Sequence, residues 1–154
     1  MFLTQPEADA LLQMQKQFSD PAPIEFTIRR PMDYDRPLHS PDRREEFLLT
    51  LERGTRNHIR LKYQTRARRA IVLARLELNA SRHRNPPGSP YKPNQWIGRT
   101  HLHVYREGFE ARVAYELADA PAWIDPAPAN EIHALELFMK FCNIVKWPPI
   151  QMIL

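Results

Sequence analysis

Alternation of apolar and polar residues with a period of two is the feature that most restricts how this chain can fold. The clearest example lies in residues 58–64, where apolar side chains at every second position are separated by basic or polar ones. Similar patterns cover 24–29, 46–52, 70–78, 100–106 and 111–117. Each pattern predicts a half-buried strand, because successive strand side chains point to opposite faces. Short turns join most of them, which favours an antiparallel sheet of about six strands, largely a meander.

Helical patterns lie at both ends of the chain. Thr4 and Glu7 have the spacing of a capping box, and the apolar residues after them predict a helix over 5–18. Asn130 is the candidate N-cap of a second helix, whose apolar stripe covers 132–142. A sheet flanked by an N-terminal and a C-terminal helix is an α+β fold.

Proline-rich segments separate the periodic ones. Residues 31–43 hold three prolines and three aspartates, and residues 80–99 hold four prolines, so both predict loops. A connection as long as 80–99 inside a compact domain is more often functional than not. The apolar tail 147–154 could pack on the core or on a second subunit.

Length and composition limit the class of protein. A chain of 154 residues fits one domain over 1–154. The single cysteine, Cys142, excludes an internal disulfide, and its apolar neighbours predict a buried thiol. There is no apolar stretch of membrane-spanning length, and the first residues lack the features of a signal peptide. We therefore expect a cytoplasmic protein with no membrane partner.

The positive charge is concentrated in the middle of the chain. Between Arg53 and Arg84 there are ten Lys and Arg residues against one acid, Glu77, which is a net charge of +9. Such asymmetry is typical of a polyanion partner. The alternative is a solvated face whose counter-charges come from the acidic ends of the chain.

The segment Thr100–Tyr105 carries the candidate chemistry. In a strand, His101, His103 and Tyr105 would share one face, with the two imidazoles about 7 Å apart along the strand. We expect Leu102 and Val104 to be buried, and both histidines to be at least partly accessible. On an earlier strand Arg75 and Glu77 also share a face. The candidate catalytic set is therefore His101, His103, Tyr105, Arg75 and Glu77.

Basic and aromatic residues in and near the long loop are candidates for contact with nucleic acid. Rings beside cations suit stacking on single-stranded bases, with the cations contacting phosphates. The candidate nucleic-acid-binding residues are Arg60, Lys62, Arg82, His83, Arg84, Tyr91, Lys92, Trp96 and Arg99.

Three hypotheses compete for the histidine cluster. In metal-free RNA cleavage, histidines exchange the protons, because their pKa lies near neutrality, and Arg75 stabilises the phosphorane. In a zinc site, His101 and His103 would act with His83 and a carboxylate. In the third, the residues form an exposed polar face or a surface for a protein partner. The first hypothesis requires no metal and no cofactor.

The middle of the sequence resembles a known family. The residues that carry the resemblance are Arg75-x-Glu77, His83-Arg84-Asn85-Pro86-x-Gly88 and Thr100-His101-Leu102-His103-Val104-Tyr105-Arg106-Glu107-Gly108-Phe109. They resemble an uncharacterised family of small bacterial proteins, several of them associated with phages or mobile elements. Its pattern is His-x-Asn-Pro-Asp-Gly followed by His-Leu-His-x-Tyr-x-Glu-Gly, and Pro87 replaces the aspartate here. The resemblance implies where the site lies and a mobile-element context, but no reaction.

These observations lead to two functional expectations. The first is a small protein that interacts with RNA or single-stranded nucleic acid, with metal-independent endoribonuclease activity as its enzymatic form. The alternative is a non-enzymatic phage-type inhibitor or adaptor that binds a bacterial or phage protein.

Overall fold

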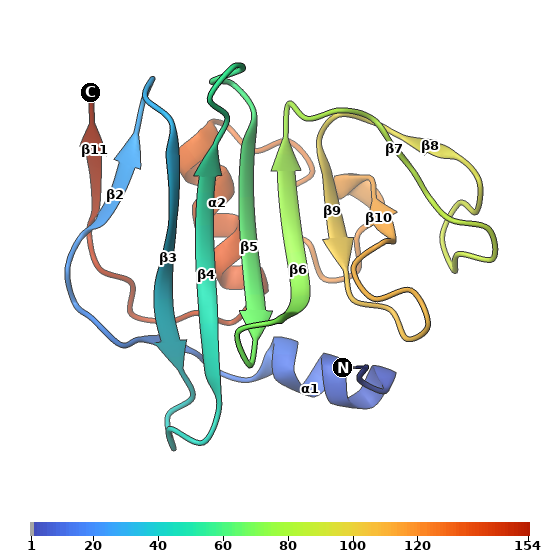
Figure 1. Cartoon of the computed structure of the whole chain (residues 1–154), viewed down its shortest axis with the longest axis horizontal. Coiled ribbons are helices and arrows are strands. Elements are labelled where there is room, and N and C mark those ends of the chain that lie inside the picture. Colours follow the sequence, from blue (N-terminus) through green and yellow to red (C-terminus); the bar gives the residue numbers. More distant parts are fainter. Residues whose placement is uncertain (1) are drawn as a thin grey trace.

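A seven-stranded antiparallel sheet organises the molecule (Figure 1). The computed structural model describes residues 2–154 and confirms the α+β class with a largely meander sheet. In spatial order the strands are β1 (Gln17–Phe18), β3 (Met32–His39), β4 (Glu46–Arg53), β5 (Leu61–Ala67), β6 (Ile71–Leu78), β9 (His101–Val104) and β10 (Ala114–Tyr115). The expected hairpin between residues 100–106 and 111–117 is the pair β9–β10.

Two short ribbons lie at opposite ends of this sheet (Figure 1). At one end β2 (Ile24–Thr27) pairs in parallel with β11 (Ile150–Ile153). The apolar tail therefore packs within its own chain, and β2 belongs to this ribbon rather than to the main sheet. At the other end β7 (His83–Arg84) pairs with β8 (Trp96–Ile97), so the expected loop over 80–99 contains a small hairpin. We call residues 80–99 the arm.

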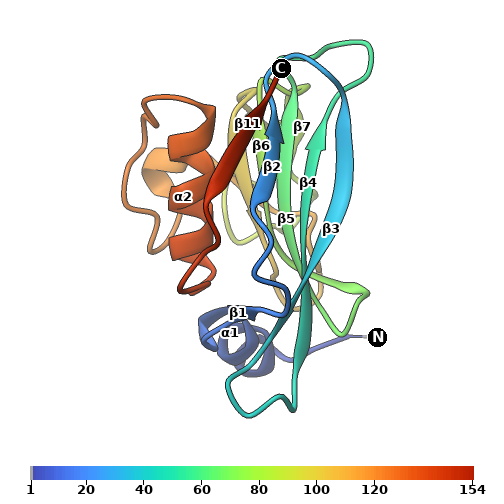
Figure 2. The ribbon, with the colours of Figure 1, turned by 90° about the vertical axis from the view of Figure 1, so that its left-hand side faces the viewer.

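Both helices cover the same face of the sheet (Figure 2). Helix α2 (Glu131–Phe141) begins at the expected N-cap, Asn130, and a short 3₁₀ turn, η1 (Leu117–Asp119), precedes it in the chain. Cys142 ends α2 and is fully buried, and burial raises the pKa of its thiol to about 11. No helix within residues 2–154 has the length and hydropathy needed to cross a membrane.

Helix α1 (Gln5–Gln13) has the predicted capping box but is shorter than expected. The prediction of a helix to residue 18 was wrong, because Gln17 and Phe18 pair with β3 as strand β1. Met14 leaves the helical conformation at ψ 132°. Strand pairing thus outweighs the helical spacing of Phe18.

The prediction of a loop over residues 31–43 was also wrong, because most of it forms β3, an eight-residue strand paired along its whole length with β4. Pro37 does not interrupt this pairing. Its carbonyl accepts a hydrogen bond from Ser19 N–H on the side away from β4, so the missing N–H of Pro37 also falls on that side.

The two faces of the sheet differ in composition. The helix-covered face holds the apolar core, including Leu49, Leu51, Tyr63 and Leu76. On the other face, matched strand registers align polar side chains in two rows across five strands. One row is Asp33, Glu52, Lys62, Glu77 and His101, and the other is Asp35, Thr50, Gln64, Arg75 and His103. We call this surface the polar face.

Buried cations attach the outer elements to the core. The fully buried Lys16 ammonium donates to the carbonyls of Leu12, Met14 and Cys142 at 2.7–2.9 Å. These carbonyls lie at the C-terminal ends of α1 and α2, where a helix dipole favours a cation. Arg53 makes an equivalent link from β4 to the carbonyl of Thr27 and to the carboxylate of Glu131.

We expect Lys16→Met to lower the free energy of unfolding by about 2–3 kcal/mol, because one buried and two partly buried carbonyls lose their donor. Urea denaturation would measure the change. Lys140→Met is the matched control, since Lys140 is exposed in the last turn of α2. Equal stability of the two variants would show that the ammonium does not hold the helix ends together.

Candidate functional site

Pairing between β6 and β9 brings the predicted catalytic residues together. Glu77 lies opposite His101, and Arg75 lies opposite His103, all on the polar face. The Nε2 atoms of His101 and His103 lie 2.9 Å and 3.5 Å from Glu77 Oε2. We call Glu77, His101 and His103 the triad.

The histidines are not accessible, and this part of the prediction was wrong. Leu102 and Val104 are buried as expected, but His101 and His103 are only 0% and 1% exposed. Their face of β9 is covered by the arm, which places the His83 ring 4.7 Å from the His103 ring between centroids. Strand alternation correctly separated the two faces but could not reveal this second covering layer.

Each triad histidine is oriented by a backbone carbonyl. His101 Nδ1 lies 2.6 Å from the carbonyl oxygen of Gly98, and His103 Nδ1 lies 2.8 Å from that of Ala111. Because a carbonyl only accepts hydrogen bonds, each Nδ1 carries a proton and donates it. The other ring nitrogen of each histidine, Nε2, faces Glu77.

The surroundings of the triad shift its pKa values strongly. Burial lowers the pKa of His103 to about 4, which keeps its imidazole neutral near pH 7. Burial alone would raise the pKa of the Glu77 carboxyl. The hydrogen bond with His101 and the guanidinium of Arg75 outweigh that effect and hold the pKa of Glu77 well below its usual range. The site thus combines an ionised carboxylate with a neutral imidazole.

Tyr105 does not join the triad, contrary to the strand alternation. The chain leaves β9 after Val104, and Tyr105 N–H donates to the carbonyl of Leu73, at the β-bulge in β6. The Tyr105 hydroxyl accepts from Leu3 N–H at 2.7 Å and is buried in the core. Tyr105 anchors the N-terminal segment instead.

The β7–β8 hairpin divides the predicted nucleic-acid-binding residues between its two sides. His83, paired with the buried Ile97, turns inward to the triad, and its Nε2 lies 2.8 Å from the carbonyl of Arg112. On the outer side Arg84 pairs with Trp96, and the Arg82 guanidinium lies 5.3 Å from the Trp96 ring centroid. Trp96 is 55% exposed.

Asn85 fixes the arm to the sheet, a role that the sequence analysis missed. Its amide donates to the carbonyl of Ala114, and its side-chain oxygen accepts from Ala114 N–H, both at 2.9 Å. It also donates to the carbonyl of Tyr91. Asn85 is 1% exposed, so these bonds are shielded from water. The His-x-Asn spacing, which puts both side chains on one side of the chain, was the available signal.

Pro87 is a central residue of the turn formed by residues 86–89. The carbonyl of Pro86 accepts from Ser89 N–H, and Gly88 has a φ of 77°. A proline followed by a glycine with positive φ is typical of a type II turn. The departure from the aspartate of the resembled pattern therefore fits the local backbone.

Two of the other predicted contact residues, Tyr91 and Lys92, lie together, and Arg99 lies elsewhere on the arm. Tyr91 stacks on Tyr115 and donates to Asp119, and Lys92 lies 4.0 Å from the same carboxylate. Arg99 donates to the carbonyl of Ala80 at the base of the arm.

Most of the concentrated basic charge is neutralised by folding. Seven of the ten basic residues from Arg53 to Arg84 form ion pairs within the described part of the chain. Their partners come mainly from β3, β4 and α2, and Glu77 within the same stretch pairs with two of them. The three without an ion pair in residues 2–154 are Arg56, Arg82 and Arg84, two of them on the arm.

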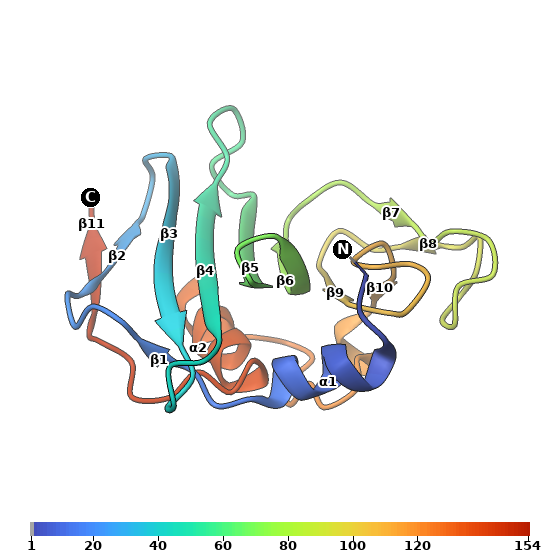
Figure 3. The same ribbon diagram turned by 60° about the horizontal axis from the view of Figure 1, so that its bottom comes forward.

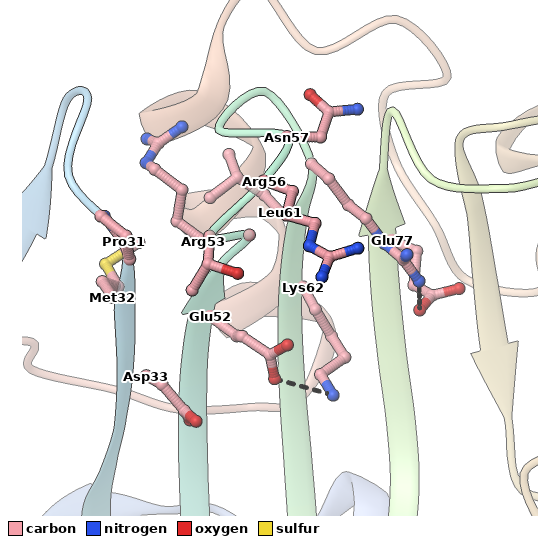
Figure 4. Close-up of a pocket in the computed structure, with 13 residues that line it drawn as sticks. Pro31, Met32, Asp33, Glu52, Arg53, Arg56, Asn57, Leu61, Lys62 and Glu77 are labelled. Carbon is pink, nitrogen blue, oxygen red and sulfur yellow. Dashed lines mark ion pairs between the residues drawn. The ribbon is translucent and has the colours of Figure 1, made fainter.

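An open cavity of about 490 Å³ lies on the polar face beside the β4–β5 turn (Figure 4). Arg60 and Lys62 line it but are paired with Glu77 at 3.9 Å and Glu52 at 2.9 Å. Glu77 thus borders two environments, with Oε1 toward Arg60 and Oε2 toward the triad histidines.

The chain belongs to a protein family of unknown function, DUF6978, which matches residues 3–144 and so includes the triad and the arm. This confirms the resemblance to an uncharacterised family. No curated protein and no solved structure matches the chain.

We expect Asn85→Ala to lower the free energy of unfolding by about 2–3 kcal/mol, because the backbone N–H and carbonyl of Ala114 lose a shielded partner. The arm should also become more sensitive to limited proteolysis. Gln95→Ala serves as the control, since that side chain is exposed on the same arm. Identical digestion of both variants would contradict the anchoring role.

Proposed function

We propose that this member of the DUF6978 family binds single-stranded nucleic acid, and RNA in particular, through the outer side of the arm. The observation that supports the proposal is the exposed Trp96 ring beside Arg82 and Arg84. Aromatic rings stack on bases of any sequence, and adjacent arginines contact the backbone phosphates.

The charge of the arm supports the same function. Residues 80–99 contain four basic residues, Arg82, Arg84, Lys92 and Arg99, and no acidic one. Elsewhere in the basic stretch, ion pairs satisfy most cations, so a phosphate would have to displace a carboxylate there. The arm lies at the end of the sheet away from β2 and β11, as Figure 3 also shows.

Cleavage of RNA is not part of the proposal. A general acid or base must reach the proton that it transfers. His101 and His103 are closed off by the arm, so they meet this requirement poorly. The alternative is that the outer side of the arm binds a protein partner. This hypothesis would remain if nucleic acid failed to bind.

We expect Trp96→Ala to weaken binding of a labelled single-stranded RNA by about 1–3 kcal/mol, or roughly 5- to 150-fold, with an unchanged salt dependence. The double variant Arg82→Ala/Arg84→Ala should lower the slope of log affinity against log salt by about 1.4, since each phosphate contact contributes about 0.7. Fluorescence anisotropy over a salt series would measure both.

Two controls match these changes. Phe2→Ala removes an exposed ring, and Arg29→Ala/Arg30→Ala removes the same charge from exposed positions between β2 and β3. Neither should alter the slope or the affinity as much as the arm variants. Absence of binding at low salt would refute the proposal, and cleavage of the RNA during the titration would restore the catalytic hypothesis.

A further inference from the structure

One buried ring nitrogen of the triad lacks a hydrogen bond. His103 donates from Nδ1 to the carbonyl of Ala111, and its Nε2 is buried without a hydrogen-bond partner in residues 2–154. That nitrogen faces a carboxylate oxygen 3.5 Å away. If the imidazole is neutral, its lone pair faces those of the carboxylate while the ring itself is only 1% exposed, which is unfavourable unless a cation lies between them.

His101 presents a similar conflict. Its Nδ1 faces the carbonyl of Gly98 and its Nε2 faces Glu77 Oε2, and both oxygens are acceptors. The ring can satisfy both only as a buried imidazolium, or as a neutral ring whose Nε2 shares a cation with the carboxylate. One ion at the centre would resolve the conflicts of both histidines at once.

We propose that Glu77, His101 and His103 together bind one divalent transition-metal ion of the zinc class. Their three candidate donor atoms all lie within 4.8 Å of one another. Zinc bonds of about 2.0–2.1 Å in a tetrahedron place donor atoms roughly 3.3 Å apart. The two separations from Glu77 Oε2, 2.9 Å and 3.5 Å, are close to this value, and the separation of the two imidazole nitrogens is at most 4.8 Å.

The donor types restrict the ion. Two imidazole nitrogens and one carboxylate oxygen suit zinc, cobalt or nickel, whereas magnesium and calcium prefer oxygen donors alone. The carbonyls of Gly98 and Ala111 already hold the Nδ1 protons, which is the outer-shell arrangement that orients metal-binding histidines. Arg60 and Arg75 approach the other carboxylate oxygen, Oε1.

Three protein ligands would leave the fourth position of a tetrahedral ion open, whereas structural zinc sites usually have four protein ligands. The ion would join β6 to β9 beneath the arm, where His83 packs against both triad histidines. Without a metal, the same residues could form a buried ion pair between Glu77 and a doubly protonated His101. Metal titration distinguishes this ion pair from a metal site. The set expected from the sequence also included His83, which is absent here because its Nε2 lies 2.8 Å from the carbonyl of Arg112.

The test uses the full chain, purified without metal-affinity chromatography, with metal content measured before and after dialysis against a chelator. Cobalt(II) is the probe, because bound cobalt gives visible absorption bands. We expect one equivalent to bind, zinc to displace it, and zinc to raise the midpoint of thermal unfolding, as a ligand of the folded state does.

His103→Gln and Glu77→Gln should each weaken cobalt binding by at least about 100-fold, since even outer-shell changes cost 10- to 100-fold. His58→Gln, at an exposed position, should bind like the wild type. Circular dichroism would show that the variants fold. Failure of wild-type protein to hold one equivalent of cobalt or zinc, or wild-type affinity in a folded His103→Gln, would overturn the site. Nucleic-acid binding is measured separately and does not bear on this result.

Discussion

The register between β6 and β9 is the constraint on which the site depends. It places Glu77 against His101 and Arg75 against His103, with Leu76 and Leu102 paired on the core side. A slip of one residue would exchange the faces and put two imidazoles into an apolar core. The apolar pairs therefore fix the position of the polar ones, and the triad is a consequence of core packing one residue away.

The sequence predicted those parts of the fold that have a local signal. Alternation located β4, β5, β6 and β9, and the capping residues Thr4 and Asn130 located the start of both helices. The alternation pattern did not locate β3, because its sequence of prolines and aspartates does not alternate. Pairing with β4 outweighs this local preference. Strand β1 was missed for the same reason.

The candidate site was only partly predictable. The shared face of His101 and His103 follows from strand periodicity, whereas their burial depends on a segment that returns over them from residues 80–99. Tyr105 lies past the end of β9, and its hydroxyl bonds to Leu3 near the other end of the chain. Contacts between separate segments carry no local sequence signal, so neither outcome could be read from spacing alone.

The parallel ribbon has a consequence for the order of folding. Strands β3, β4, β5 and β6 are each joined to the next by a short turn, so their contacts are close in sequence. Ile24, in contrast, pairs with Ile150 near the other end of the chain. Bringing the two ends of so long a segment together lowers the chain entropy before any contact between β2 and β11 has formed. We therefore expect the meander to form as a nucleus, with β2 left unpaired until β11 arrives in the last stage of folding.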